Sequence, residues 1–243
     1  MRATYFLDRL HDGCKGLRDL FFPRRCIVCG RFLKTEENDL CTRCTDELPL
    51  TYQWDIVQNA AFERIARRCE AEAAASLFYF LEKSDMRKIV YGIKYGGRQK
   101  LGYRMGQLLG SRLAGSRQFG ACQAVVPVPL HPLRHWKRGY NQAEAIARGV
   151  AAALDLPVET ALLRRCRHTR TQTRLQGAAK AQNVRGAFRT DARRSAQLQA
   201  AGIRHLLLID DVLTTGSTLA ACMQPLLDAG FKTSAATLAF AGS

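Results

Sequence analysis

Two adjacent carboxylates, followed by a turn of small hydroxyl residues, are the groups of this chain best suited to chemistry. Asp210 and Asp211 come directly after an apolar run, residues 206–209. The turn contains Thr214, Thr215, Gly216, Ser217 and Thr218. Carboxylates accept hydrogen bonds from hydroxyl groups and ligate Mg²⁺, whereas hydroxyl and backbone N–H groups donate to phosphate oxygens. The spacing therefore predicts a site for a ligand that carries both hydroxyl and phosphate groups.

The elements that must position these groups form a strand–turn–helix–strand unit. Residues 206–209 lack helical periodicity and predict a buried parallel strand, and residues 232–240 predict a second strand. The apolar positions at helical spacing between them are Leu219, Met223, Leu226 and Leu227. Gly230 should end this helix, and Pro225 should kink or break it. The unit is a βαβ crossover.

This arrangement suits a phosphorylated sugar. The first N–H groups of a helix lack internal partners and the helix dipole is positive there, so a phosphate monoester fits the turn. Gly216 lets the ligand approach the backbone, while Asp210 and Asp211 at the strand end can accept from vicinal ribose hydroxyls and hold Mg²⁺. An ordinary strand and helix with an Asp-rich cap is the alternative. The pattern is neither a P-loop nor a dinucleotide fingerprint.

Residues 206–218 resemble the phosphoribosyl pyrophosphate (PRPP) signature of type I phosphoribosyltransferases. The resemblance implies that the carboxylates bind the ribose and that the turn binds its 5-phosphate. It also implies Mg²⁺ as the ion bound together with PRPP.

Four cysteines predict a metal site near the N-terminus. They form two CxxC pairs, Cys26 with Cys29 and Cys41 with Cys44. Two such knuckles make a closed tetrahedral zinc site without an open position, so we expect a structural Zn²⁺. A redox CxxC is the alternative, although it needs only one pair. An apolar helical face at residues 6–21 precedes the knuckles and would pack on the zinc module, a membrane or a partner.

Composition indicates a globular α/β protein with a small appendage. The chain has 243 residues, of which 47% are hydrophobic, and we expect an N-terminal helix and zinc finger at residues 1–55 before a phosphoribosyltransferase-like domain at residues 56–243. The sequence contains no stretch of about 18 apolar residues, so we expect no transmembrane helix. Charges at Arg2, Asp8, Arg9 and Asp12 exclude a signal-peptide core. We therefore expect a cytoplasmic protein.

The formal net charge of +16 indicates an anionic partner. Basic residues are densest between Arg164 and Arg194, where Asp191 is the only acidic residue. Nucleic acid, diphosphate or both would suit this segment. A solvated surface of high pI without a partner is the alternative.

Further elements follow from periodicity. Helices are expected at residues 60–75, 85–94, 101–113 and 141–154, the last capped by Asn141, and strands at 77–81 and 124–130. Cations and aromatic residues follow the strand 124–130, which makes Pro129, Arg138 and Gly139 candidates for the diphosphate side of the site. Lys94 is a further candidate, with a solvated loop as the alternative. Trp136 would stack on a base or pack against the protein.

Residues 168–183 lack a hydrophobic period and predict a long cationic loop, which a short strand at residues 184–188 would close. Its candidate ligand-binding residues are Arg170, Gln172 and Lys180. We expect this loop to act as a mobile lid that shields a reactive diphosphate from water.

These motifs together resemble the ComF family of competence proteins, which includes GntX-type proteins. They run in a consistent order over most of the chain: the four cysteines and residues 93–95, 126–130, 138–142, 167–172, 183–188 and 208–218. The resemblance implies a type I phosphoribosyltransferase-like parallel sheet flanked by helices, behind an N-terminal zinc finger. Its diphosphate-side loop falls on residues 128–130 and 138–142. Lys180 stands where the family usually has Arg.

The resemblance also implies a role in DNA uptake and in the handling of single-stranded DNA during natural transformation, with a DNA-uptake helicase as a protein partner. Two hypotheses follow. The chain is a binding module that holds PRPP or a phosphoribosyl nucleotide while its basic surface engages single-stranded DNA. Alternatively it is an active phosphoribosyltransferase that displaces diphosphate from PRPP, with an acceptor that the sequence does not identify.

Overall fold

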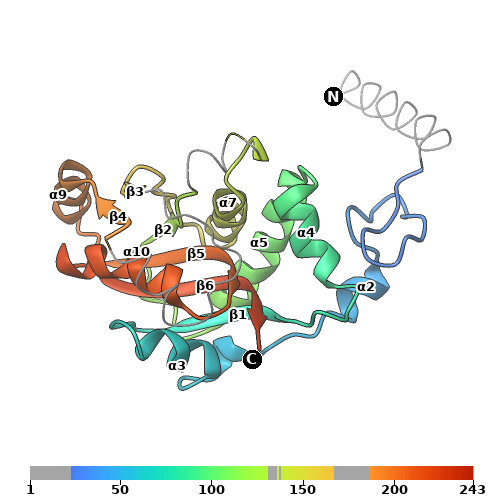
Figure 1. Ribbon diagram of the computed structural model, residues 1–243, viewed down its shortest axis with the longest axis horizontal. Helices are drawn as coiled ribbons and strands as arrows, with labels where there is room; N and C mark the ends of the chain where they lie inside the picture. The colour runs from blue at the N-terminus through green and yellow to red at the C-terminus, as the bar shows by residue number, and fades with distance from the viewer. Residues whose placement is uncertain (1–22, 131–135, 137, 167–185, 243) are drawn as a thin grey trace, which may run out of the picture. The chain divides into compact units, whose positions relative to one another are not determined.

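The computed structural model describes residues 23–130, 136, 138–166 and 186–242 (Figure 1). The apolar face expected at residues 6–21 and the loop candidates Arg170, Gln172 and Lys180 lie outside the described residues. The chain forms two compact units, Met1–Leu48 and Pro49–Ser243. Each is described by itself.

The first unit is a small loop-rich module. Its helix α2, Thr42–Asp46, is capped by Cys41, and Arg25 pairs with Phe32 in an isolated antiparallel bridge. Glu37 holds the segment between the two cysteine pairs, because its carboxylate accepts from the backbone N–H groups of Lys34 and Thr42 at 2.8 Å each. These N–H donors come first among the causes that lower the pKa of Glu37 to about 2, so this carboxylate stays ionised at neutral pH.

The second unit is built on a parallel sheet with the strand order β1-β6-β5-β2. The strands are β1 (Ala74–Phe80), β2 (Ala124–Pro127), β5 (His205–Leu213) and β6 (Lys232–Ala241). Strands β5 and β6 are joined by helix α10, Ser217–Asp228, which confirms the predicted βαβ crossover. Gly230 follows the helix with φ +85°, and Pro225 lies inside a helix that continues to Asp228.

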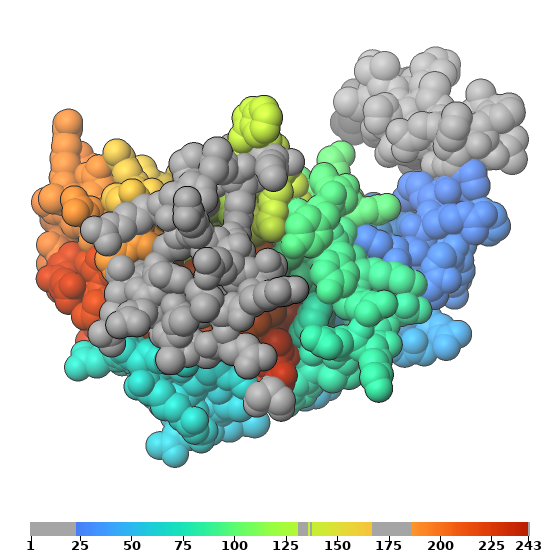
Figure 2. Space-filling view, viewed as in Figure 1, coloured from blue at the N-terminus to red at the C-terminus, as the bar shows by residue number. Residues whose placement is uncertain are grey.

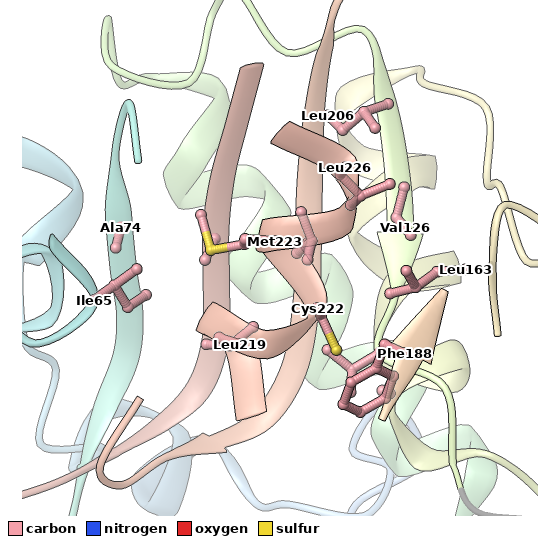
Figure 3. Close-up of a cluster of buried hydrophobic side chains, with 14 of the residues drawn as sticks. Ile65, Ala74, Val126, Leu163, Phe188, Leu206, Leu219, Cys222, Met223 and Leu226 are labelled. Atoms are coloured by element: carbon pink, nitrogen blue, oxygen red, sulfur yellow. The ribbon is translucent and has the colours of Figure 1, made fainter. Parts of the chain in front are cut away.

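Helices cover both faces of the sheet, which confirms the expected fold class. On one side are α5 (Gln99–Ala114) and α7 (Gln142–Leu154), with α4 (Arg87–Tyr95) against α5. On the other side, α3 (Ala60–Ala66) and α10 pack on the strands and enclose the apolar cluster drawn in Figure 3, which includes Ile65, Leu206 and Met223. No helix among the described residues is long and apolar enough to span a membrane.

The remaining elements lie beside the sheet. They are η1 (Gln53–Asp55), α9 (Ala192–Ala200) and an antiparallel hairpin of β3 (Leu163–Arg165) and β4 (Phe188–Thr190). A strand was predicted at residues 184–188, but the described strand begins at Phe188. The hairpin brackets the segment predicted to be the cationic loop.

Helices α5 and α7 approach each other so closely that glycine is required at their contact. A Cβ atom on Gly106 would lie 2.1 Å from the carbonyl oxygen of Ile146, and one on Gly149 would lie 2.0 Å from that of Tyr103. No side chain fits at such distances, so the two backbones pack directly on each other. This contact fixes the start of α7, which carries site residues.

Two expectations need correction. The helix predicted at residues 60–75 ends at Ala66, and Ala74 and Ala75 belong to β1, because buried parallel pairing with β6 overrides the helix propensity of alanine. The strand predicted at residues 206–209 continues to Leu213, since β6 still pairs with it there. The helices expected at residues 85–94, 101–113 and 141–154 are confirmed within a few residues.

Candidate functional site

The four predicted zinc ligands come together in the first unit. The Sγ atoms of Cys26, Cys29, Cys41 and Cys44 all lie within 4.8 Å of one another. A tetrahedral Zn²⁺ with Zn–S bonds of about 2.3 Å requires sulfur atoms about 3.8 Å apart. The Sγ atoms of Cys29 and Cys41 are 3.8 Å apart, so the cluster fits a closed structural Zn²⁺ site.

Backbone N–H groups support these sulfur atoms. The Cys41 N–H donates to Cys26 Sγ at 3.5 Å, and the Cys44 N–H donates to Cys41 Sγ at 3.4 Å. Burial raises the pKa of the Cys26 thiol, but backbone N–H donors, first those of Cys29 and Cys41, outweigh it and bring the pKa down to about 6. Burial and the neighbouring thiols raise the pKa of Cys44. A bound divalent cation would stabilise the thiolate form of all four cysteines.

In the second unit, Asp210 and Asp211 lie near the carboxyl edge of the sheet. They are inside β5 as judged by its pairing with β6, but neighbouring β2 has already ended, with Pro127 opposite Ile209 as the last pair. Adjacent residues of a strand point to opposite faces. The two carboxylates therefore have different surroundings, although the sequence makes them look equivalent.

Asp211 is buried and held by two helices. Its Oδ1 atom is 3.1 Å from Lys94 Nζ at the end of α4, and its Oδ2 atom accepts from Gln142 Nε2 at 3.0 Å at the start of α7. The other amide atom, Gln142 Oε1, is buried and has no hydrogen-bond partner among the described residues. Asp211 thus joins β5, α4 and α7 at the edge of the sheet.

Asp210 is partly exposed and has a different electrostatic environment. Its Oδ1 atom accepts from the backbone N–H of Asp211 at 2.8 Å. Burial, together with the negative charge of Asp211, raises the pKa of Asp210 to about 7, although Lys94 and Arg165 act in the opposite direction. An incoming cation or hydroxyl donor would stabilise the ionised form.

Two arginines, Arg64 in α3 and Arg68 just after it, donate hydrogen bonds to carbonyl oxygens of the hydroxyl-rich turn. Arg64 Nη1 donates to the carbonyl oxygens of Thr214 at 2.5 Å and Ala241 at 2.6 Å, and Arg68 Nε donates to that of Thr215 at 2.7 Å. The Arg64 guanidinium also lies 4.2 Å over the Phe240 ring. Sequence reasoning missed both arginines, because nothing in residues 60–75 indicates contact with a turn about 150 positions later.

These contacts orient the N–H groups of the turn. In a trans peptide the C=O and the following N–H point in opposite directions, so the N–H groups of Thr215 and Gly216 point away from the arginines. Among the described residues, no partner accepts from the N–H groups of Thr215, Gly216 and Thr218. Gly216 has φ +76° and precedes the first residue of α10, while Thr215 Oγ1 lies 3.0 Å from Ser217 Oγ. The turn is therefore a set of N–H and hydroxyl donors at a helix N-terminus.

The matching family model is described as "Double zinc ribbon domain" and covers residues 17–54. Competence protein F of Haemophilus influenzae is 26% identical over 210 residues, covering 82% of this chain and 89% of that protein. DNA utilization protein YhgH of Escherichia coli O157:H7 is 27% identical over 216 residues, covering 86% of each. The resemblance to the ComF family is confirmed. Residues 17–54 contain four cysteines, enough for one closed zinc site.

The solved structures that resemble the chain include one titled as a glutamine PRPP amidotransferase from B. subtilis complexed with ADP and GMP. It is 19% identical with a TM-score of 0.38, and the match covers 60% of this chain and 30% of that one.

The segment 138–142 leads into α7, whose first residue, Gln142, contacts Asp211. Asn141 Nδ2 donates to the Val128 carbonyl at 3.1 Å, and its Oδ1 accepts from Ala143 N–H at 3.1 Å, so it caps α7 as predicted. The Tyr140 hydroxyl donates to the carbonyl of Ile93. These bonds tie the segment to the loop after β2 and to α4.

The four residues predicted to lie on the diphosphate side of the site differ in their contacts. Lys94 contacts Asp211, whereas the Arg138 guanidinium lies 5.0 Å over the ring of Tyr95. Gly139 has φ +75°, and Pro129 lies in the half-buried loop after β2. Of these four, Lys94 is the one ion-paired to a carboxylate of the site.

The arginines of the basic segment, residues 164–194, differ in their contacts where the structure describes them. Arg164 pairs with Asp191 at 3.0 Å, and Arg194 forms two bonds to the buried carboxylate of Glu159, at 2.7 and 2.8 Å. Arg165 lies 5.2 Å over Phe188. Several of its arginines therefore support the fold of the hairpin and α9.

Proposed function

We propose that the chain binds PRPP or a phosphoribosyl nucleotide at Asp210 and the turn 214–218, and that it handles single-stranded DNA during DNA uptake. The observation that carries the ligand proposal is the set of N–H groups of Thr215, Gly216 and Thr218 without acceptors among the described residues. They stand at the N-terminus of α10, where backbone N–H groups and the helix dipole favour a phosphate. Such a site without an anion would leave several donors unused.

Asp210 would bind the ribose. It is partly exposed, and its raised pKa of about 7 indicates a carboxylate whose charge is poorly compensated by the protein alone. Vicinal hydroxyls would donate to it and lower the pKa. Asp211 would contribute mainly by holding Lys94 and Gln142 in place, because both of its oxygens already have protein partners.

The donor set also fits Mg²⁺. This ion prefers one or two carboxylates together with phosphate oxygens and retained water. Asp210 supplies one such carboxylate, and a bound diphosphate would supply the remaining anionic oxygens. When bound, Mg²⁺ would neutralise the diphosphate charge next to Asp210.

The DNA role rests on different support. The relatives are named competence protein F and DNA utilization protein, and they match over more than four fifths of this chain. A formal net charge of +16 favours association with nucleic acid through its phosphates. If this role is right, the affinity for single-stranded DNA falls steeply as salt rises, and affinity independent of salt would contradict it.

Calorimetric titration tests the ligand proposal. PRPP with Mg²⁺ should bind to the whole chain, and PRPP with excess chelator should bind at least about tenfold more weakly, since the ion neutralises the diphosphate. Ribose 5-phosphate should compete for the same site. The variant Thr215→Val, which removes one hydroxyl donor, should bind more weakly, whereas Asp228→Asn at the far end of α10 should match the wild type. Absence of PRPP binding would overturn the proposal.

Phosphoribosyl transfer is a second candidate, favoured by the N–H donors at the N-terminus of α10, which would hold the 5-phosphate in place while C1 reacts. An amine or nucleobase nitrogen would form the new bond to C1, diphosphate would leave with the electron pair of the broken bond, and the proton of the acceptor would pass to solvent. Release of diphosphate with purine, pyrimidine and amine acceptors tests this reaction. PRPP binding without release for any of them would limit the chain to binding.

A further inference from the structure

One face of α4 carries exposed aromatic side chains that the core does not use. Arg87, Tyr91 and Tyr95 stand four residues apart, a spacing that places them along one side of the helix. Tyr91 is 47% exposed and Tyr95 is 70% exposed. The opposite side of α4 buries Ile89 and Ile93 against the rest of the unit. Two neighbouring exposed tyrosines present aromatic surface to solvent.

These rings are held in a row. The Phe80 ring meets Tyr91 edge-on at a centroid distance of 6.3 Å, and Tyr91 lies 6.1 Å from Tyr95 with an interplanar angle of 31°. At the other end, the Arg138 guanidinium lies 5.0 Å over the Tyr95 ring. Because Phe80 and Arg138 hold the row at both ends, the two tyrosines are ordered before any ligand binds.

The row of tyrosines lies next to the candidate phosphoribosyl site. Lys94, the residue before Tyr95, reaches Asp211 with its ammonium group, and Tyr140, close to Arg138 in sequence, bonds to the carbonyl of Ile93. In the space-filling view the green surface formed by α4 and α5 faces the viewer (Figure 2). A ligand on the tyrosines would therefore be adjacent to the carboxyl edge of the sheet.

We infer that Tyr91 and Tyr95 form a stacking platform for successive bases of single-stranded nucleic acid. The inference rests on the proposed DNA role and names the surface that performs it. Unpaired bases expose their faces and stack on aromatic side chains without a sequence requirement, while cations contact the strand phosphates. Arg87 and Arg138 flank the platform at its two ends, which suits a polyanion and does not suit a wholly apolar protein segment. Duplex DNA would bind poorly here, because its bases are already stacked on one another.

Trp136 is a further exposed aromatic residue that could stack on a base. It is 84% exposed, so among the described residues it does not pack into the core. It stands two positions before Arg138 in the sequence. An exposed tryptophan near the arginine end of the row would offer a further surface for a base.

Binding of a fluorescent oligothymidylate, followed by anisotropy, tests the platform. The double variant Tyr91→Ala/Tyr95→Ala should bind about tenfold or more weakly than the wild type, because stacking is lost at two positions. Tyr91→Phe/Tyr95→Phe keeps both rings and should bind within about twofold of the wild type. Tyr52→Ala removes another exposed tyrosine, 57% exposed and outside α4, and should leave the affinity unchanged.

An abasic oligomer of the same length separates stacking from charge. It should bind more weakly than oligothymidylate to the wild type, and the difference between the two oligomers should be smaller for the double alanine variant, in which Trp136 is the remaining surface for a base. Equal affinity of the wild type for the two oligomers, or wild-type binding of oligothymidylate by the alanine variant, would overturn the platform while leaving the DNA role intact. Absence of any single-strand binding by the wild type would overturn both, and unchanged PRPP binding by the alanine variant would show that its fold is preserved.

Discussion

The cysteine cluster and the Asp210 site are assembled in opposite ways. All four thiols, and the N–H groups that support them, come from residues 26–44. The Asp210 site combines β5, the turn before α10, Lys94 of α4, Gln142 of α7 and Arg64 of α3. A local site can be read from spacing alone, because chain connectivity fixes its geometry. A distributed site depends on packing between elements that are distant in sequence.

The largest expected effect is on the cysteine cluster, the site assembled from neighbouring residues. Cys44→Ser removes one ligand from a cluster with no open position, so the protein should lose its zinc and the first unit should unfold. Zinc content per chain by mass spectrometry, together with protease sensitivity of residues 23–48, measures this. Cys166→Ser is the matched control, since Cys166 is exposed and outside the cluster. Full zinc content in Cys44→Ser would contradict the four-thiolate site.

The distributed site should be most sensitive to packing between helices. Gly149→Ala places a Cβ atom 2.0 Å from the Tyr103 carbonyl oxygen, so α5 and α7 must separate. We expect a loss of about 2–3 kcal/mol in the free energy of unfolding, near the upper end for overpacking, and weaker PRPP binding because Gln142 begins α7. Chemical denaturation measures the first effect. Gly120→Ala, with 3.8 Å to the nearest backbone atom, should be tolerated, and equal stability of the two variants would refute the close contact.

A smaller effect is expected from loss of Arg64, which donates hydrogen bonds to the carbonyl oxygens of Thr214 and Ala241. Arg64→Ala removes two hydrogen bonds to carbonyl oxygens and should reduce PRPP affinity about tenfold, since a bond to a charged donor contributes about 1.5–3 kcal/mol. Titration calorimetry measures the affinity. Arg67→Ala is the control, because Arg67 pairs only with exposed Glu63, at 3.6 Å, in the described contacts. Equal binding by the two variants would show that the turn keeps its shape without Arg64.

The smallest effect is the pH dependence of stability at Asp210. Its pKa is raised from 3.8 to about 7 in the folded chain, so the folded state binds more protons than the unfolded state between these values. Stability should therefore fall as pH rises through this window. Asp210→Asn removes the dependence and should raise the melting temperature by about 2–4 °C at pH 8, the shift expected for a change near 1 kcal/mol in a chain of this size. No gain at pH 8 relative to pH 4 would contradict the raised pKa.

The same contrast explains how much the sequence predicted. The cysteine cluster, the βαβ unit and the Asn141 cap depend on local patterns and are confirmed. The extent of the helix after residue 60 was wrong, because parallel pairing of Ala74 with β6 decides it. Arg64 and the difference between the two carboxylates were missed. Neither follows from residue type or spacing, since both arise from contacts between distant elements.

We propose that Asp210 contacts the ligand directly, whereas Asp211 mainly holds Lys94 of α4 and Gln142 of α7 against β5. Titration of PRPP and Mg²⁺ into Asp210→Asn tests it most directly, with the melting temperature of the same sample measured at pH 8. We predict that binding is lost, by a factor of about 100 or more for a charged partner, in a protein at least as stable as the wild type. Wild-type affinity for PRPP in a folded Asp210→Asn variant would contradict the account.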